Sequence, residues 1–274
     1  MNTQIAQNIA FIGGGNMASA LISGLLAQGV TTAQIDVVEP FEKARQKLQS
    51  SFGIEALAAP STALQRANLV VWAVKPQTFK DAARQTRDVI STALHLSVAA
   101  GITSSSIACW LGTERIVRAM PNTPALIGKG ITGLYARAGV SAADRSLIDQ
   151  VIATTGELLW LTDEAQLDAV TAISGSGPAY MFYFMEAMTE AGEQMGLPRD
   201  QAYKLAVATF IGAGELARVS TEPPEVLRQR VTSKGGTTYA AITSMEHSNI
   251  KNLFMRALLA AQIRAREMGE EFGG

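Results

Sequence analysis

The chain has 274 residues, which is enough for one large domain or two modest ones. Apolar residues make up 47% of it, so a substantial core can be buried, and 23 basic residues balance 24 acidic ones. This balance argues against a broad basic face for nucleic acid or for an anionic membrane.

The single cysteine, Cys109, excludes a disulfide within the chain and fits a reducing cytoplasm. We expect it to be a small buried hydrophobe, with a nucleophile as the alternative. His95 and His247 stand apart and no residues have metal-ligand spacing, so no metal site is expected. Neither a secretory signal nor an apolar run of roughly 20 residues is visible, so we expect a soluble, cytoplasmic protein.

The first half alternates short apolar runs with amphipathic stretches. Five runs are rich in Val and Ile and apolar on both faces, as strands buried in a parallel sheet are. These runs are residues 8–13, 35–39, 69–74, 94–100 and 115–120. Helical patterns lie between them, for example Asn16–Gln28 and Pro76–Ile90, and further strands are expected near 130–136 and 157–161, on either side of a helix that starts about Ser141. The alternation predicts a doubly wound, mostly parallel α/β sheet.

From about Asp163 the strands stop and helical patterns continue to the end of the chain. The expected helices are residues 164–173, 178–195, 199–219, 223–231, 237–246 and 249–269. Several are apolar on more than one face, as over Tyr180–Met188, so we expect this half to bury area against a second subunit. Burial against the first half is the alternative. Gly212 and Gly214 lie inside an expected helix, where a glycine costs about 1 kcal/mol relative to alanine, and close approach of another helix would offset that cost.

The sequence "FIGGGNMASAL" contains Gly13-x-Gly15-x-x-Ala18 between an expected strand and an expected helix, as a dinucleotide-binding fingerprint requires. Gly13 permits a tight turn, and Gly15 lets the backbone approach a pyrophosphate. Main-chain N–H groups at the positive end of the helix would then face the phosphates. The alternative is a tight glycine turn without a ligand. The residues predicted to bind the cofactor here are Ile12, Gly13, Gly14, Gly15, Asn16 and Met17.

Glu39 ends the second expected strand, 21 residues past Ala18, where an acidic side chain accepts hydrogen bonds from the adenosine ribose. A carboxylate there repels a 2′-phosphate, so the predicted cofactor preference leans mildly toward NADH. Lys43 and Arg45 follow and could still serve a phosphate. The alternative role of Glu39 is an acid at a helix N-terminus, and both roles can hold together.

Loops at the ends of three further strands should line the same crevice. The first contains Lys75, which either favours phosphates or a substrate carboxylate, or is a solvated lysine that ends a strand. The second contains small residues that would let a nicotinamide pack closely, and the third offers the side chain of Asn122. The predicted cofactor contacts in these loops are Ala73, Val74, Lys75, Pro76, Ala99, Ala100, Gly101 and Asn122.

No Ser/His/Asp set and no Gly-x-Ser-x-Gly motif is present, so a strong catalytic base is not expected. Reduction of a C=N bond needs a hydride and an already protonated nitrogen, and does not need such a base. A site made of backbone N–H groups and hydroxyls would suffice.

Six stretches resemble the pyrroline-5-carboxylate reductase family, in its order and spacing and from end to end of the chain. They are "FIGGGNMA", "AVKPQ", "SVAAG", "RAMPNTPA", "DAVTAISGSGPAY" and "VTSKGGTTYAAI". The resemblance implies an α/β N-terminal Rossmann domain over residues 1–162 and an all-α helical dimerisation and substrate domain over residues 163–274. It further implies reduction of Δ1-pyrroline-5-carboxylate to L-proline with NADPH or NADH, in a homodimer that often builds a larger homo-oligomer.

The resemblance also implies a substrate site. Thr238 would donate a hydrogen bond to the ring nitrogen as the catalytic residue, and the turn before it would hold the substrate carboxylate. The implied substrate-binding residues are Glu164, Ser233, Gly235, Gly236, Thr237 and Thr238. Arg230 matches a position beside the family's site. A plain turn between two helices is the alternative reading of residues 233–238.

The chain departs from many members of the family at Lys234, where they have proline; this lysine could contact substrate, cofactor or only water. Two other functions compete with the reductase. A β-hydroxyacid dehydrogenase would need a catalytic lysine on a central helix, and Lys204 is the only candidate. A dimer that senses NAD(P) without turnover would not need the hydroxyl-rich turn.

Overall fold

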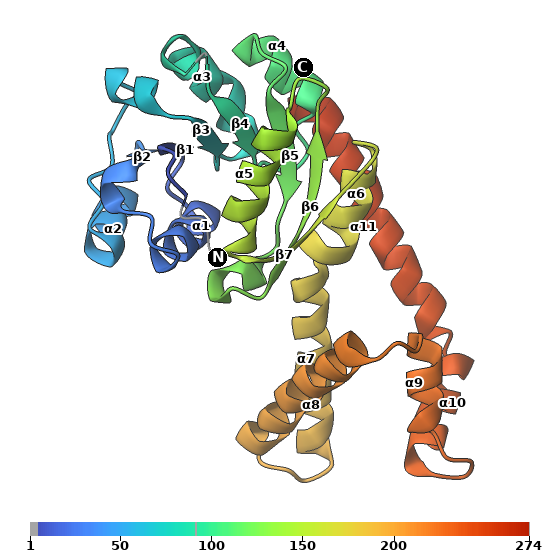
Figure 1. Ribbon diagram of the computed structural model, residues 1–274. Helices are drawn as coiled ribbons and strands as arrows, with labels where there is room; N and C mark the ends of the chain where they lie inside the picture. The colour runs from blue at the N-terminus through green and yellow to red at the C-terminus, as the bar shows by residue number, and fades with distance from the viewer. Residues whose placement is uncertain (1–4, 91, 274) are drawn as a thin grey trace. The chain divides into compact units, whose positions relative to one another are not determined.

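The computed structural model describes residues 5–90 and 92–273 and divides the chain into two compact units. One unit extends to Ser176 and includes the segment from Ala261 onward, and the other is Gly177–Ala260. The first unit contains a seven-stranded sheet with helices on both faces, and the second is helical (Figure 1). This is the predicted fold class.

The sheet is parallel except for one pair of neighbours. Its strands are β1 (Ile9–Ile12), β2 (Ile35–Val38), β3 (Leu69–Trp72), β4 (Leu94–Ser97), β5 (Ile116–Met120), β6 (Gly130–Ala136) and β7 (Gly156–Trp160). They lie in the order β2-β1-β3-β4-β5-β6-β7, and only β5 and β6 run antiparallel. The winding reverses between β1 and β3, and the crevice outside the carboxyl ends of two such strands is where doubly wound folds bind ligands.

The helices of the first unit alternate with its strands. They are α1 (Asn16–Ala27), α2 (Glu42–Phe52), α3 (Pro76–Thr86), α4 (Ser104–Leu111), α5 (Ala142–Ala153) and α6 (Gln166–Val170). The second unit contains α7 (Gly177–Gln194), α8 (Arg199–Val219), α9 (Pro224–Arg230), α10 (Thr237–His247) and the first part of α11 (Ile250–Phe272).

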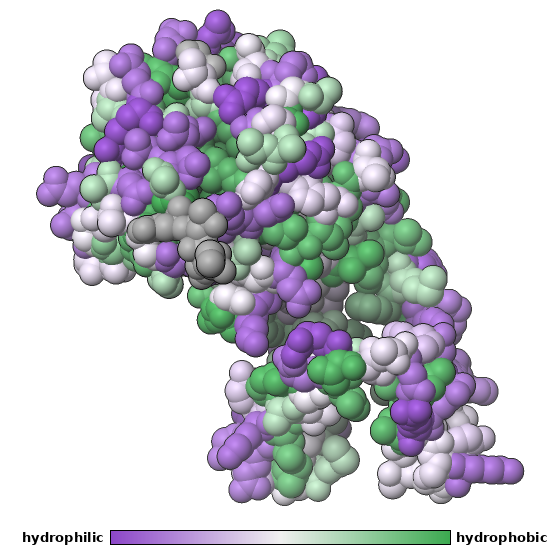
Figure 2. All heavy atoms as spheres, in the orientation of Figure 1, coloured by the Kyte–Doolittle hydropathy of each residue, from purple (hydrophilic) through white to green (hydrophobic). Residues whose placement is uncertain are grey.

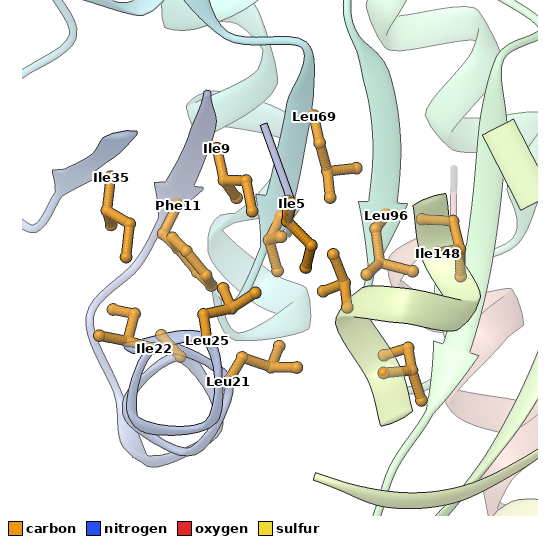
Figure 3. Packing of buried hydrophobic residues seen from close by; sticks show 14 of the residues in the cluster. Ile5, Ile9, Phe11, Leu21, Ile22, Leu25, Ile35, Leu69, Leu96 and Ile148 are labelled. Carbon is orange, nitrogen blue, oxygen red and sulfur yellow. The ribbon is translucent and has the colours of Figure 1, made fainter. Parts of the chain in front are cut away.

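Two apolar layers sandwich the sheet, because successive strand residues point to opposite faces. On one face Ile9 and Phe11 of β1 pack with α1 and α5 residues such as Leu21 and Ile148 (Figure 3). On the other face Trp72 of β3 packs with residues of α3 and α4. Burial on both faces explains why the strands read as continuous apolar runs.

Strand β4 is shorter than predicted: it ends at Ser97 rather than at residue 100. The chain then turns, and Gly101 adopts a φ of +78°, a conformation that side chains disfavour. A β-carbon at Gly101 would lie 3.0 Å from the β-carbon of Met268, so the end of α11 packs directly on this turn. The missing strand residues therefore form a loop at the carboxyl edge of the sheet.

Cys109 is exposed, so the prediction of a buried hydrophobe is wrong. Helix α4 buries Ile107, Trp110 and Leu111, and the helical period turns residue 109 outward. His95 is buried in the core, where its Nδ1 accepts a hydrogen bond of 3.2 Å from the indole nitrogen of Trp72. Among the described residues no group of three or more His, Cys, Asp and Glu could hold a metal ion, and no helix is both long and apolar enough to cross a membrane.

The helical unit exposes many large apolar side chains. Helices α7 and α8 pack tightly, since a β-carbon at Gly192 would lie 2.6 Å from that of Ala202. These two helices also carry exposed Phe182, Tyr203 and Ile211, and Figure 2 shows apolar residues gathered over them. An exposed apolar area of this extent marks an interaction surface.

Candidate functional site

The glycine turn between β1 and α1 lies at the reversal point of the sheet. Gly13 has a φ of +98°, and a β-carbon there would lie 2.5 Å from the carbonyl oxygen of Ala73. Its N–H donates to the carbonyl of Val38 across 2.8 Å, and the N–H of Ala73 donates to Ile12 across 2.8 Å. Only glycine therefore allows the ends of β1, β2 and β3 to close around this turn.

The far side of the turn is open. Gly15 and Asn16 are exposed and Met17 is half-buried. Beyond its chain neighbours, no heavy atom of the described residues lies within 4 Å of where a β-carbon at Gly15 would be. No side chain among the described residues caps the N-terminus of α1, and the first turn of this helix has no acidic residue. The N–H groups at this helix end can therefore approach an anion.

Glu39 lies beneath the turn, and its side chain is almost fully buried. Its Oε2 accepts a hydrogen bond of 2.8 Å from the N–H of Gly14, and its Oε1 accepts one of 2.9 Å from the N–H of Phe41. Arg45 donates through Nη1 to the carbonyls of Glu39 and Pro40, at 3.0 and 2.7 Å. The carboxylate is thus held at the end of β2, in the place where the fingerprint requires an acidic residue.

The predicted loops after β3 and β4 lie at the same edge of the sheet. Val74 contacts the turn, because a β-carbon at Gly13 would lie 3.2 Å from its Cγ1. Lys75 is exposed just before α3, and Pro76 is the first residue of that helix. In the next loop Ala99 is buried and Ala100 is half-buried. These residues line up along the carboxyl ends of neighbouring parallel strands.

Asn122, after β5, has a clear structural contact. Its side chain is buried and its Oδ1 accepts a hydrogen bond of 3.0 Å from the N–H of Ile131 at the start of β6. Nearby, a β-carbon at Gly175 would lie 2.5 Å from the methyl carbon of Met120. Gly175 ends a π-helical turn, Thr171–Gly175, and such turns are frequent at functional sites. The stretches "RAMPNTPA" and "DAVTAISGSGPAY" therefore meet at this point.

Glu164 belongs to an ionic network that the sequence did not indicate. Its Oε1 accepts from the N–H of Ser104 at 2.6 Å and from Arg118 at 2.7 Å, and its Oε2 accepts from the Ser104 hydroxyl at 2.6 Å. Burial alone would raise the pKa of Glu164, but the hydrogen bonds from Ser104 and the charge of Arg118 outweigh it and lower that pKa. An arginine inside the buried run "RIVRAM" was the available signal, since a buried guanidinium requires an anionic partner.

Glu164 and Gly101 line one pocket of about 590 Å³ within the first unit. Arg118, Asp168, Arg266 and Glu270 are its other charged residues. Burial raises the pKa of Asp168, against the opposing effect of Arg118 and Arg266. The pocket brings together a predicted cofactor contact and a predicted substrate contact.

The predicted substrate turn lies in the second unit. The carbonyl of Ser233 accepts a hydrogen bond of 3.0 Å from the N–H of Gly236, and Gly235 has a φ of +79°, as the third residue of a type II turn does. Gly236 immediately precedes α10, and no side chain of the described residues caps that helix. Thr237 and Thr238 form its first turn; Thr237 is exposed and Thr238 half-buried. The turn thus presents main-chain N–H groups and hydroxyls together.

Two basic residues near this turn differ in their contacts. Lys234 is exposed at the second position of the turn. Arg230 forms an ion pair of 2.6 Å with Glu222, so its side chain is held on the helical unit.

Comparisons with known proteins identify relatives of this chain. Residues 164–268 match the protein family described as pyrroline-5-carboxylate reductase dimerisation, and residues 8–101 match the one described as NADP oxidoreductase, coenzyme F420-dependent. A pyrroline-5-carboxylate reductase from Pseudomonas aeruginosa is 47% identical over 267 residues, which cover 97% of this chain and 98% of the relative.

Two solved structures are similar to this chain over 96% of its length and over 98% of the length of each solved chain. A pyrroline-5-carboxylate reductase from Coxiella burnetii is 39% identical with a TM-score of 0.88. A pyrroline carboxylate reductase from Plasmodium falciparum, with NADP bound, is 27% identical with a TM-score of 0.87. The chain therefore belongs to the pyrroline-5-carboxylate reductase family.

Proposed function

We propose that this chain reduces the C=N bond of Δ1-pyrroline-5-carboxylate to give L-proline, with NADPH or NADH as the hydride donor. One observation carries the proposal: a glycine turn at the reversal point of a doubly wound sheet coexists with an uncapped helix end bearing two threonines. The first suits a dinucleotide and the second suits a small carboxylate.

The glycine turn fits the cofactor. Apart from its chain neighbours, no described residue comes within 4 Å of a β-carbon placed at Gly15, so a pyrophosphate could approach the N–H groups of Gly15, Asn16 and Met17. Lys75, exposed at the same edge of the sheet, would add positive charge near the phosphates. When bound, the reduced nicotinamide supplies the hydride.

The residues after β4 and β5 would form the wall of the nicotinamide site. Ala99 and Ala100 have small side chains, which would let a flat ring approach, whereas the end of α11 occupies the place of a side chain at Gly101. Asn122 would contribute through its amide nitrogen, because its Oδ1 already accepts from Ile131. The role of these residues is to position the ring and keep water away from it.

The turn at Ser233–Gly236 would bind the substrate carboxylate. Gly235 and Gly236 leave the N–H groups of the first turn of α10 open, and the hydroxyls of Ser233 and Thr237 add donors. Thr238, half-buried beside them, would accept a hydrogen bond from the N–H of the protonated ring nitrogen through its hydroxyl oxygen and orient the ring. The imine enters already protonated, so the chain needs no strong base.

Glu164 would act at the substrate side of the pocket that it shares with Gly101. Both of its carboxylate oxygens already accept hydrogen bonds from Ser104, and Oε1 also accepts from Arg118. Each carboxylate oxygen has two lone pairs, so Oε2 can still accept a hydrogen bond from the N–H of the ring nitrogen.

Residues 163–274 would serve as the dimerisation and substrate domain, and residues 1–162 as the dinucleotide-binding domain. The match to a dimerisation family supports a homodimer, and the exposed apolar faces of α7 and α8 give it a surface. We extend this to a larger homo-oligomer built from dimers. The single cysteine suits a reducing, cytoplasmic compartment.

The test is a comparison of three reactions that follow the absorbance of the reduced nicotinamide. We expect this absorbance to fall when the reduced cofactor is mixed with Δ1-pyrroline-5-carboxylate. It should not change with β-hydroxyacids plus the oxidised cofactor, or with the reduced cofactor alone. Turnover of hydroxyacids would favour a dehydrogenase, and binding without any turnover would favour a sensor; either result would contradict the proposal.

A further inference from the structure

We infer that the fixed carboxylate of Glu39 makes this enzyme select NADH over NADPH. The inference rests on the proposed binding of the cofactor at the glycine turn and deepens it, because it names which of the two cofactors the turn takes. A buried carboxylate at the end of β2 accepts hydrogen bonds from the 2′-hydroxyl of an adenosine ribose and repels a phosphate in the same place.

The position of Glu39 is fixed on every side. Its own N–H donates to the carbonyl of Leu57 across 2.8 Å, and its two side-chain oxygens accept from the N–H groups of Gly14 and Phe41. The residue is only 6% exposed. To turn its charge away from a phosphate, the side chain would have to break both hydrogen bonds from the backbone. Each oxygen nevertheless keeps a lone pair that can accept from a ribose hydroxyl.

One basic neighbour of Glu39, Arg45, is hydrogen-bonded to the backbone of the same loop. Arg45 uses Nη1 to donate to the carbonyls of Glu39 and Pro40, so its guanidinium supports the loop from which the carboxylate projects. In folds of this type a nearby arginine accommodates the 2′-phosphate of NADP, and Arg45 is the arginine that could do so here. Lys43 is exposed on the first turn of α2, directly after the acidic Glu42. The fixed carboxylate of Glu39 is therefore the feature that favours an uncharged ribose.

Glu39 also positions the glycine turn, and this determines the choice of variants. A β-carbon at Gly14 would lie 3.3 Å from the Cβ of Glu39 and 2.6 Å from Leu48, so the turn rests on this side chain. Removing the carboxylate should weaken the binding of both cofactors to some extent. The negative charge, in contrast, should affect only the difference in affinity between NADH and NADPH.

The experiment measures direct binding of NADH and of NADPH by titration of the reduced-nicotinamide fluorescence, without substrate. For the unmodified chain we expect a Kd for NADH about tenfold or more below that for NADPH, because like charges brought together in a partly buried site repel strongly. Glu39→Gln and Glu39→Ser should bring the two Kd values to within about threefold of each other. Glu39→Asp keeps the charge and should keep the preference for NADH.

Arg45→Met is the matched control. If Arg45 only supports the loop, this variant should change both Kd values by a similar factor. Equal or tighter binding of NADPH by the unmodified chain would overturn the inference, as would a selective loss of NADPH binding in Arg45→Met. If neither cofactor binds, the inference and the proposed cofactor site fail together. A retained NADH preference without turnover of the imine would support the inference while the proposed reaction fails.

Discussion

Arg118 of strand β5 and Glu164, just before helix α6, form an ion pair of 2.7 Å in which the arginine side chain is only 9% exposed. The same carboxylate accepts hydrogen bonds from the backbone and the hydroxyl of Ser104, at the first turn of α4. Three elements of the first unit therefore depend on one charge. Residue 164 is also where the match to the dimerisation family begins.

Glu164→Gln should destabilise the protein by about 2 kcal/mol at neutral pH, because it leaves the buried charge of Arg118 without a partner. The folded-state pKa of Glu164 is lowered, so its stabilisation is present above pH 4.5 and is lost as the pH falls through the folded pKa. Urea unfolding followed from about pH 5 down to about pH 3 should show this loss in the unmodified chain, because the loss falls below pH 4.5, and a flatter profile in the variant. Glu114→Gln, which breaks the exposed pair with Arg137, is the control and should change stability much less.

Thr238→Ala should lower kcat/KM for the imine about tenfold or more, since a hydrogen bond to a charged group contributes about 1.5–3 kcal/mol. Thr238→Val, which keeps the shape without the hydroxyl, should behave alike. Thr243→Ala, at an exposed position on the same helix, is the control and should keep full activity. Unchanged turnover in both Thr238 variants would show that the hydroxyl has no role in the reaction.

Substitution by alanine should affect stability at one glycine of the turn and cofactor binding at another. Gly13→Ala should lower the melting temperature, because its β-carbon would meet the Ala73 carbonyl at 2.5 Å and its φ is +98°. Gly15→Ala should fold normally but weaken cofactor binding about tenfold or more, because its methyl group projects into the space needed by the pyrophosphate. Thermal melts and cofactor titrations of both variants check this prediction. Normal cofactor affinity in Gly15→Ala would show that the phosphates do not bind beside Gly15.

His95 should make the protein less stable in mild acid. Burial, assisted by the charge of Arg115, lowers its pKa from 6.5 to about 4. Between these values the unfolded chain binds a proton that the folded chain does not, so stability is complete above pH 6.5 and falls as the pH approaches 4. The loss should reach about 3 kcal/mol, at about 1.4 kcal/mol per pKa unit. When the free energy of unfolding is measured by chemical unfolding between about pH 7 and about pH 4, His95→Gln should lack this loss. An equal dependence on pH in the variant would assign the acid sensitivity to other groups.

Ile211→Arg should disrupt the homodimer. Ile211 is exposed on α8, and β-carbons at the neighbouring Gly212 and Gly214 would have nothing within 4 Å among the other described residues. A partner helix could therefore approach closely there, and a buried arginine would prevent it. Analytical ultracentrifugation should show a smaller species for this variant, while Gln49→Arg, exposed on α2, should sediment like the unmodified chain. An unchanged assembly in Ile211→Arg would place the interface elsewhere.

The sequence was most informative where a pattern is local. The further strand expected near residues 130–136 is β6 in the structure, and Pro76 gave the first residue of α3. The limits of β4 were less accurate, because "SVAAG" has the composition of a strand but turns after Ser97, where Gly101 packs on the end of α11. A contact between residues so far apart in the chain leaves no local signal.

The candidate site divides in the same way. The glycine turn could be predicted because its function depends on backbone conformation and on the absence of side chains, which the residue types themselves reveal. The links from Glu39 to Gly14 and from Glu164 to Arg118 could not be predicted, since each joins residues 25 to 46 positions apart. Cys109 was misjudged because composition does not say which face of a helix a residue occupies.

The central claim is hydride transfer to a cyclic imine, and an isotope experiment tests it most directly. The enzyme would be given NADH carrying deuterium at C4 of the nicotinamide, with Δ1-pyrroline-5-carboxylate, and the product analysed by NMR and mass spectrometry. We predict L-proline that contains one deuterium, on the ring carbon remote from the carboxylate, for each NADH oxidised with the label in the transferred position. Oxidation of the cofactor without labelled proline, or deuterium at any other carbon, would contradict the account.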